Sequence, residues 1–314
     1  MKKTGVVIKS TGSWYTVRTK DDQVINCRIR GKFRMSGIKS TNPVTVGDIV
    51  DIELEKDKEN AVIINIHERK NYIIRKSVKL SKQTHIIAAN IDQVFLLVTL
   101  KEPQTFTSFI DRFLATAEAY SIPAILLFNK LDIYNKDLLK EKQKLQKIYR
   151  DIGYECLDIS AIDNINLNKL KKIMQGRVNM FSGHSGVGKS TLINKIAPGL
   201  GLKTADISTL HKQGQHTTTF AEMFELPFGG YIIDTPGIKG FGVVDFDEDE
   251  IGDYFPEFFN LKDQCKFNNC LHTNEPNCAI KQAVEDGKIA FSRYRSYLQL
   301  LAGEDENYRV DDYI

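Results

Sequence analysis

The chain has 314 residues, of which 42% are hydrophobic, so it is long enough for two or three domains with packed cores. No apolar run approaches the ~20 residues that a membrane span needs, and polar residues return by Lys9, so neither a span nor a signal-peptide core is predicted. We therefore expect a soluble, cytoplasmic protein. The net charge is uneven: residues 1–70 carry +5, residues 71–244 carry +7 and residues 245–314 carry −9. A basic front favours a polyanionic partner only weakly, because scattered lysines also solvate a surface.

Residues 1–70 show the pattern of a small all-β domain. Apolar and polar residues alternate, most clearly over residues 50–54, which indicates strands with one buried face. The predicted strands are Gly5–Lys9, Trp14–Arg18, Gln23–Ile29, Asp48–Leu54 and Ala61–Ile66. They predict an OB-type β-barrel. Basic residues gather around Phe33 in and after the third strand, namely Arg28, Arg30, Lys32, Arg34 and Lys39. Such a loop would bind RNA by charge and stacking, whereas an ordinary solvated loop is the alternative.

Residues 71–244 alternate between apolar runs and amphipathic segments. The predicted strands are Val94–Val98, Ala124–Phe128, Cys156–Ile159, Val178–Phe181 and the apolar run that begins at Tyr231. The predicted helices lie over Phe106–Ala117, Lys136–Tyr149, Leu167–Met174 and Thr191–Ile196; the first would bury Phe106, Phe109, Ile110, Phe113, Leu114 and Ala117 on one face. This alternation predicts a parallel sheet with helices on both faces, the α/β class.

A phosphate-binding loop is predicted between the strand at 178–181 and the helix that follows it. Its residues are Gly183, His184, Ser185, Gly186, Val187, Gly188, Lys189, Ser190 and Thr191. The spacing of Gly, four residues, then Gly-Lys-Ser is that of the P-loop. Backbone N–H groups would face a polyphosphate, Lys189 would reach the outer phosphates, and the Ser190 hydroxyl would hold Mg²⁺. A glycine-rich turn between two elements is the alternative.

The second predicted strand ends at a motif that selects guanine, formed by Asn129, Lys130, Leu131 and Asp132. The Asp132 carboxylate can accept hydrogen bonds from guanine N1–H and from the exocyclic amine, and adenine offers neither pattern. An acidic helix cap is the alternative for Asp132. The third strand ends at Ser160 and Ala161, where GTPases supply a backbone N–H to the guanine carbonyl oxygen.

Two further segments match the parts of a GTPase that respond to the γ-phosphate. Residues 231–234 form an apolar strand that ends in Asp234, and the pattern Asp-x-x-Gly is completed by Gly237. Asp234 would hold Mg²⁺ through water, and the Gly237 N–H would sense the γ-phosphate. A threonine among Thr217, Thr218 and Thr219 would complete the metal shell, and the sequence leaves open which one. Lys189, Thr218 and Gly237 are the predicted catalytic groups.

The motifs come in a shifted order, with the guanine motif first and the phosphate loop third, so the domain is predicted to be circularly permuted. In this order, and with a barrel before and a Cys/His module after, the chain resembles the RsgA/YjeQ family of circularly permuted GTPases. The resemblance rests on residues 214–219, 234–237 and 265–278 and covers nearly the full length. It implies GTP hydrolysis stimulated by the small ribosomal subunit, contact with its rRNA, and a role in checking or completing its late assembly.

The residue that follows the Asp-x-x-Gly motif is not one that can orient the attacking water. Many GTPases place a water-orienting Gln there, whereas this chain has Ile238, which cannot position a nucleophile. Some relatives carry a histidine further along this loop as a candidate catalytic residue. This chain has Asp245 at that place, so the catalytic role of the histidine cannot be assigned here. His216 is another candidate, or it serves packing or RNA contact. Slow intrinsic hydrolysis that depends on a partner is therefore expected.

Three cysteines and a histidine lie within fourteen positions near the C-terminus: Cys265, Cys270, His272 and Cys278. Three thiolates and one imidazole match a closed, tetrahedral structural zinc site. Cys27 and Cys156 lie in strand patterns and are interpreted as core residues. Helices are predicted over Asp249–Phe259, Ala279–Glu285 and Ile289–Leu301, followed by an acidic tail.

The sequence thus predicts three domains, an OB-fold barrel (1–70), a circularly permuted P-loop GTPase (71–244) and a zinc-binding module with C-terminal helices (245–314), in a protein expected to be monomeric. An RNA-binding scaffold in which GTP is a structural or switching ligand is an alternative. An RNA-modifying enzyme would need a second active site, for which no residues outside the GTPase segment qualify.

Overall fold

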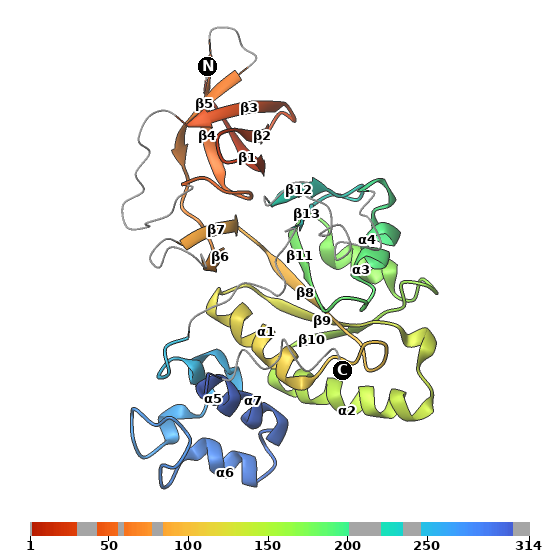
Figure 1. Ribbon diagram of the computed structural model, residues 1–314, viewed down its shortest axis with the longest axis vertical. Helices are drawn as coiled ribbons and strands as arrows, with labels where there is room; N and C mark the ends of the chain where they lie inside the picture. Colours follow the sequence, from red (N-terminus) through yellow and green to blue (C-terminus); the bar gives the residue numbers. More distant parts are fainter. Residues whose placement is uncertain are drawn as a thin grey trace, which may run out of the picture. The chain divides into compact units, whose positions relative to one another are not determined.

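The computed structural model describes residues 2–29, 43–55, 60–76, 84–200, 221–234 and 246–303 (Figure 1). The chain divides into two compact units. The first comprises residues 1–95, 166–182 and 189–243, and the second comprises residues 96–165, 183–188 and 244–314. Among the described residues, no helix combines the length and the apolar character needed to cross a membrane.

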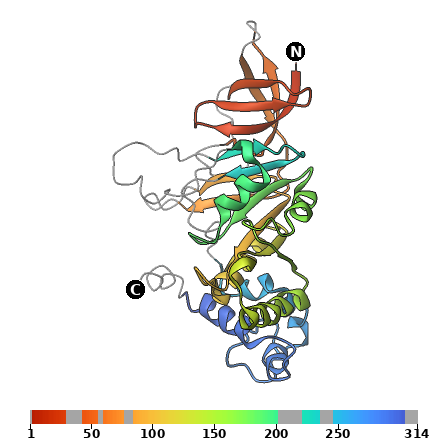
Figure 2. The same cartoon turned by 90° about the vertical axis from the view of Figure 1, so that its right-hand side faces the viewer.

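A five-stranded barrel forms the N-terminal part of the first unit, as predicted (Figure 2). Its strands are β1 (Lys2–Ser10), β2 (Tyr15–Thr19), β3 (Val24–Ile29), β4 (Ile49–Leu54) and β5 (Asn60–Ile66). They lie in the order β1-β2-β3-β5-β4, and β4 pairs back onto β1 to close the barrel. Alternate residues of each strand face inward, so that Val7, Val17, Cys27, Val50 and Ile63 are fully buried in one core.

Gly5 lies where β1 pairs with both of its neighbours, opposite Thr19 of β2 and Val50 of β4. A Cβ atom at this position would lie 2.5 Å from the carbonyl oxygen of Arg18. The absence of a side chain therefore lets β1 approach β2 closely at the closure point of the barrel. The sequence contains this glycine, but its pattern does not reveal the close approach.

Most of the predicted basic loop of the barrel lies outside the described residues. This applies to Arg30, Lys32, Phe33, Arg34 and Lys39. Arg28, on β3, is described, and its guanidinium pairs with Glu55 at 2.5 Å.

The rest of the first unit holds strands and helices of the predicted α/β segment. These are β11 (Val178–Ser182), β12 (Glu222–Glu225), β13 (Tyr231–Asp234), α3 (Leu167–Met174), α4 (Lys189–Ile196) and a short 3-10 helix (Pro198–Leu200). β11 and β13 are parallel, as predicted. β12 is antiparallel to both β13 and β1, so the expectation of a purely parallel sheet was wrong there. The chain turns from β12 to β13 through Gly229 and Gly230 at positive φ, and so short a connection permits only an antiparallel pair.

A two-stranded antiparallel hairpin, β6 (Tyr72–Lys76) and β7 (Thr84–Ala89), follows the barrel and was not predicted. It lies at the point where the barrel pattern gives way to the α/β pattern. Neither periodicity is sustained there for long enough to indicate an element.

The second unit contains the other strands and helices of the α/β segment and the C-terminal helices. The strands are β8 (Gln93–Val98, whose first three residues belong to the first unit), β9 (Ala124–Phe128) and β10 (Glu155–Asp158), in the order β10-β9-β8. The helices are α1 (Thr107–Ala119), α2 (Lys136–Ile152), α5 (Pro256–Phe259), α6 (Ala279–Glu285) and α7 (Phe291–Leu301), with 3-10 helices at Leu131–Ile133, Ile251–Tyr254 and Lys262–Gln264. β9 and β10 are parallel, and β8 is buried on both faces.

Helix α1 lies between these strands and the C-terminal helices (Figure 1). Ile110, Phe113, Leu114 and Ala117 are buried, as the helical pattern predicted. Phe106 is not part of that face, because it precedes the first helical residue in an extended conformation and is 49% exposed. Ala115 of α1 belongs to the apolar core of the C-terminal helices, so the helix is shared by two packing interfaces.

The long helix predicted over Asp249–Phe259 was wrong. A 3-10 helix over Ile251–Tyr254 is followed by an extended residue, Phe255, and by the four-residue helix α5, which begins at Pro256. A proline disfavours helical backbone in the residue before it, and its missing N–H is tolerated at the first helical position. The predicted start of α7 was also two residues early, whereas α6 has the predicted bounds.

Candidate functional site

Asn129 ties together three loops that the sequence places far apart. It follows the last residue of β9 and is 1% exposed. Its Nδ2 donates to the carbonyl oxygen of Val187, 2.8 Å away in the predicted phosphate loop. Its Oδ1 accepts the backbone N–H of Ala161 at 3.3 Å. The guanine motif, the loop after β10 and the phosphate loop therefore meet around this one buried amide.

Asp132 presents an exposed carboxylate beside this junction. It lies in the 3-10 helix Leu131–Ile133, and the Ser160 hydroxyl donates to its Oδ1 at 2.6 Å. Helix α2 is capped by a different residue, Asn135, whose side chain accepts the N–H of Leu138. The cap alternative for Asp132 is therefore wrong, and the carboxylate is held in place by Ser160.

Lys130 has a left-handed backbone conformation, with φ of 63°, and its ammonium group contacts the carbonyl oxygen of Glu102 in the loop after β8. The neighbouring Pro103 lies against the phosphate loop, because a Cβ on Gly186 would be 3.4 Å from its Cδ. The loop after β8 therefore borders both the guanine motif and the phosphate loop. The sequence did not indicate that this loop borders the site, because the loop carries no recognisable motif.

Two glycines of the phosphate loop have a positive φ and lie so close to neighbouring atoms that a Cβ at either position would clash. Gly183 has φ of 150°, and a Cβ there would lie 3.2 Å from the carbonyl oxygen of Leu97 on β8. Gly188 has φ of 94°, and a Cβ there would lie 2.5 Å from Nδ2 of Asn129. The phosphate loop therefore packs closely against the end of β8 and against the residue that follows β9.

Replacing Gly188 by Ala is expected to lower guanine-nucleotide affinity at least ~10-fold, because the new methyl group must displace the Asn129 amide and break its bond to Val187. Dissociation of fluorescent GDP would measure the effect. Gly153, at the C-terminal end of α2, also has a positive φ but has nothing within 4 Å of a built Cβ, so Gly153→Ala serves as the matched control for backbone strain. Equal effects in the two variants would contradict a specific role for the contact with Asn129.

The other residues of the phosphate loop lie as follows. Ser185 and Gly186 are exposed, and Val187 is fully buried. The His184 ring lies against the ring of Phe109 on α1, with 3.7 Å between ring centroids and an interplanar angle of 32°. Lys189, Ser190 and Thr191 form the first turn of α4, which begins two residues earlier than predicted and belongs to the first unit. The first N–H groups of a helix have no acceptor within the helix, and the N-terminal end of α4 therefore suits an anion.

Several predicted residues fall outside the described part of the chain. These are Thr217, Thr218, Thr219 and Gly237, together with His216, Ile238 and Asp245. Asp234 ends β13, but only its backbone is described. Their assignments to magnesium, to the γ-phosphate and to catalysis stay predictions.

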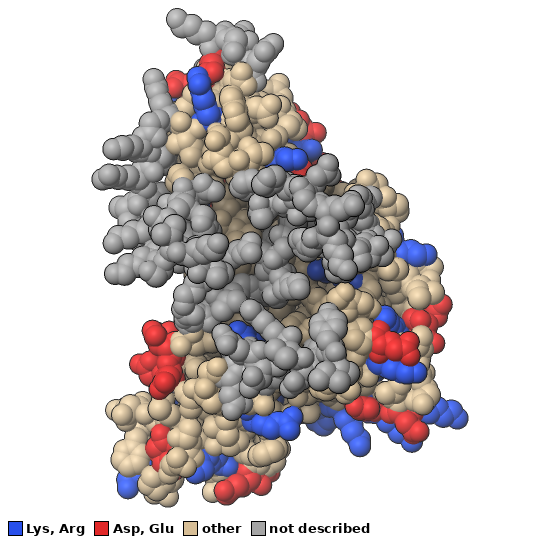
Figure 3. All heavy atoms as spheres, in the orientation of Figure 1, with Lys and Arg blue, Asp and Glu red and all other residues tan. Residues whose placement is uncertain are grey.

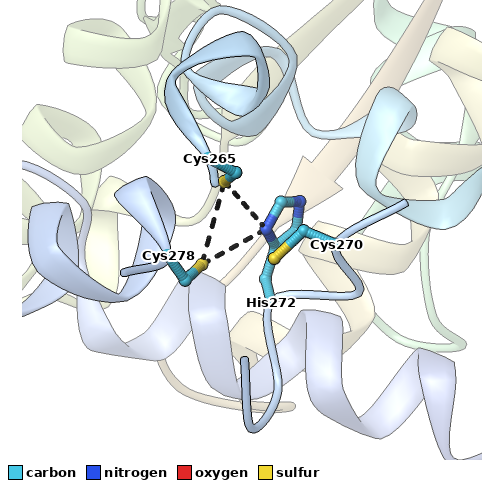
Figure 4. Close-up of side chains that lie close together, drawn as sticks. All are labelled: Cys265, Cys270, His272 and Cys278. Carbon is cyan, nitrogen blue, oxygen red and sulfur yellow. Dashed lines mark hydrogen bonds between the residues drawn. The ribbon is translucent and has the colours of Figure 1, made fainter. Parts of the chain in front are cut away.

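Cys265, Cys270, His272 and Cys278 converge as predicted, with their ligand atoms all within 4.8 Å of one another (Figure 4). Nδ1 of His272 lies 3.6 Å from Sγ of Cys265 and 3.4 Å from Sγ of Cys278. Burial lowers the pKa of His272, which favours the neutral imidazole that a metal requires. Three cysteine sulfurs and one imidazole nitrogen in this arrangement fit a closed tetrahedral metal site.

The loop that carries these ligands is held by groups around it. The Glu275 carboxylate accepts the backbone N–H groups of Leu271 and Thr273, both at 2.8 Å. From α7, the Tyr294 hydroxyl donates to the carbonyl oxygen of His272 at 2.7 Å, and the Tyr297 hydroxyl donates to that of Leu271 at 2.6 Å. The sequence signal for this support was the spacing of the two tyrosines on one face of a helix, which sequence reasoning did not use.

Cys27 and Cys156 are core residues, as predicted. Both are buried in strands, and burial raises the pKa of each thiol to about 12. They are therefore protonated core residues at neutral pH, and neither is suited to bind a metal.

Comparison with known protein families matches the barrel and the α/β segment, that is, the chain up to residue 244. A model of the RsgA N-terminal domain matches residues 4–63, and a model of the RsgA GTPase matches residues 66–244. The chain belongs to the RsgA GTPase family. It therefore hydrolyses GTP. The three loops that meet at Asn129 lie within residues 66–244, which the GTPase model covers.

Individual RsgA proteins are similar along nearly the whole chain. The protein named small ribosomal subunit biogenesis GTPase RsgA in Flavobacterium johnsoniae is 64% identical over 312 residues, which are 99% of this chain and 96% of the relative. The protein of the same name in Christiangramia forsetii is 64% identical over 311 residues, covering 98% and 99%.

Solved structures show the same fold. YjeQ from Thermotoga maritima superposes with a TM-score of 0.79 at 36% identity, covering 96% of this chain and 98% of that one. YloQ, described as a circularly permuted GTPase, superposes with a TM-score of 0.76 at 32% identity, covering 98% and 96%. The permuted motif order predicted for this RsgA-family chain agrees with that description.

Proposed function

We propose that this chain acts in the cytoplasm as a GTPase that binds the small ribosomal subunit and assists or checks its late maturation. The similarity at 64% identity to proteins named small ribosomal subunit biogenesis GTPase carries the proposal. The scaffold alternative is not favoured, because those relatives are named as GTPases. The proposed working form is a monomer.

In the proposed nucleotide complex, Asp132 accepts hydrogen bonds from guanine, Lys130 lies along the base, and Asn129 braces the loops. The segment at Ser160 and Ala161 closes the base pocket. The Ala161 N–H now donates to Asn129 at 3.3 Å, a long bond that could be shared with, or exchanged for, a guanine carbonyl oxygen.

The phosphates would lie in residues 183–188, with the Lys189 ammonium on the outer phosphates and the Ser190 hydroxyl on Mg²⁺. Asp234 and one of Thr217 to Thr219 would complete the magnesium shell, with Thr218 our choice, and Gly237 would contact the γ-phosphate. These residues neutralise and position the phosphates. Ile238 cannot orient water, so we propose that the bound subunit supplies or positions the missing group.

The Cys265, Cys270, His272 and Cys278 cluster is proposed to hold zinc in a structural role. A closed set of four protein ligands leaves no position for a water nucleophile, so the metal would stabilise the module rather than catalyse hydrolysis. The barrel (1–70) is proposed to contact rRNA, the permuted GTPase domain to span 71–244, and the zinc module to span 245–314. On the face shown in Figure 3, Lys and Arg are interspersed with Asp and Glu over the described residues.

Turnover of GTP by the purified chain, with and without purified small subunits, tests the proposal. We expect turnover far below the usual enzyme range of ~1 to 10³ s⁻¹ for the chain alone and a rise of at least ~10-fold with small subunits. Large subunits at the same concentration are the control for non-specific RNA. Fast hydrolysis by the chain alone, or equal stimulation by both subunits, would count against it.

A further inference from the structure

We propose that the metal cluster and the phosphate loop are energetically coupled through helices α7 and α1, with Arg293 and Phe109 as the positioning residues. The inference rests on the proposed nucleotide and metal sites. It adds that filling one of them tightens the other. Every contact in the route lies within the second unit.

The route begins at the metal-binding loop. The Tyr294 and Tyr297 hydroxyls of α7 bond to the carbonyl oxygens of His272 and Leu271, at 2.7 and 2.6 Å. Tyr297 is 1% exposed, so its hydroxyl has no ready exchange with water. When the four ligands are drawn together, these two carbonyls are fixed as well, and the position of α7 is fixed with them.

The next step is a buried ion cluster that joins α7 to α1. Arg293 is 1% exposed and pairs with Asp111 of α1 at 2.9 Å and with both carboxylate oxygens of Glu257 at 2.7 and 3.1 Å. Its guanidinium also lies over the Phe255 ring, 4.5 Å from the centroid. Asp111 is fully buried and accepts a second hydrogen bond from Tyr149 of α2 at 2.8 Å.

This cluster does not allow the two helices to slide past each other. Separating Arg293 from Asp111 would leave an uncompensated charge in a site that excludes water, which is far more costly than breaking an exposed pair. Helices α1 and α7 therefore move as one body.

The last step leads from α1 to the phosphate loop. Phe109 lies two residues before Asp111, in the first turn of α1, and its ring is in close, tilted contact with the His184 ring. His184 is the second residue of the loop that begins at Gly183, so its backbone must adopt a defined position when the loop encloses phosphates. A shift of α1 would displace the Phe109 ring and with it this part of the loop.

Coupling of this kind is reciprocal, because the metal and the nucleotide would stabilise the same arrangement of α1 and α7. Dissociation of fluorescent GDP from the full chain is measured before and after zinc is removed by a chelator. We expect dissociation to be ~5- to 50-fold faster without zinc. In the converse measurement, GDP should slow zinc transfer to a chromogenic chelator by a similar factor.

The variant Phe109→Leu tests the route without disturbing the buried ion cluster. Phe109 is only partly buried, so the fold should tolerate the change. We expect GDP dissociation from this variant to be the same with and without zinc. Phe106→Leu is the matched control, because Phe106 precedes the same helix and is 49% exposed, and it should keep the dependence on zinc.

Equal GDP dissociation from the zinc-loaded and zinc-free wild-type chain would overturn the coupling while leaving the nucleotide site intact. A dependence on zinc that survives in Phe109→Leu would overturn the proposed route. Failure of the zinc-loaded chain to bind GDP at all would instead overturn the proposed function, and the inference with it.

Discussion

Replacing Asp132 by Asn is expected to lower the affinity for GTP about 10²- to 10³-fold. The carboxylate would accept two hydrogen bonds from guanine, and bonds to charged groups contribute about 1.5–3 kcal/mol each. An amide can accept only one of them, and its NH₂ group would face the exocyclic amine of guanine, so one donor is left unpaired against another. Competition between unlabelled GTP and fluorescent GDP measures the loss.

The same substitution should create a new preference. Xanthine carries a carbonyl oxygen where guanine carries the exocyclic amine, so the Asn NH₂ group can donate to it while the amide oxygen accepts N1–H. The Ser160 hydroxyl can still donate to that oxygen, as it does to Asp132 at 2.6 Å, which keeps the side chain oriented. We therefore expect xanthosine triphosphate to bind the variant more tightly than GTP does.

Asp137→Asn is the matched control. It makes the same change of charge five residues along the chain, in the exposed first turn of α2, where Asp137 forms a long, exposed pair with Lys140 at 3.8 Å. It should bind GTP normally. If Asp132→Asn also binds GTP normally, or binds ATP as well as it binds xanthosine triphosphate, the base is not held by this carboxylate.

The parts of the site that sequence could predict are those in which backbone geometry and chemistry require particular residues at fixed spacing. Gly183, Gly188 and Lys189 follow from the needs of a loop that encloses phosphates, and the four metal ligands follow from their density. The motif predicts that Asn129 braces its loop, but the partners of its side chain could not be predicted. The bond of Asn129 to Val187 connects residues that are 58 positions apart, and no local pattern records such a contact.

The helices and strands that were predicted correctly are likewise those that a local sequence pattern specifies. Helices α3 and α6 and strand β9 have the predicted bounds, because each carries a sustained periodicity that ends at turn residues. The 249–259 segment is apolar enough for a helix, yet Pro256 divides it. Tertiary structure also buries Arg293 against Asp111 and Glu257, and no local pattern distinguishes this arginine from the other cations of residues 245–314.

Loss of one metal ligand, as in Cys265→Ala, is expected to abolish binding of one equivalent of zinc and to unfold the metal-binding loop. Binding of zinc to structural sites contributes about 10–16 kcal/mol near neutral pH, whereas an apolar core as small as that of the C-terminal helices rarely supplies more than ~3–5 kcal/mol. Metal content by atomic absorption and amide hydrogen exchange of the full chain measure the two effects.

The loss of protection should be graded along the module. Residues 265–278 and helix α6, which begins at the ligand Cys278, should lose protection most, because the metal is what holds them together. Helix α7 should keep part of its protection, since Arg293 anchors it to α1 through Asp111 independently of the metal. Cys156→Ala removes a buried thiol that lies outside the cluster and should leave both metal content and protection of residues 265–278 unchanged. Full protection of α6 in metal-free Cys265→Ala would mean that packing alone holds the module, and that the four converging ligands are not needed for its fold.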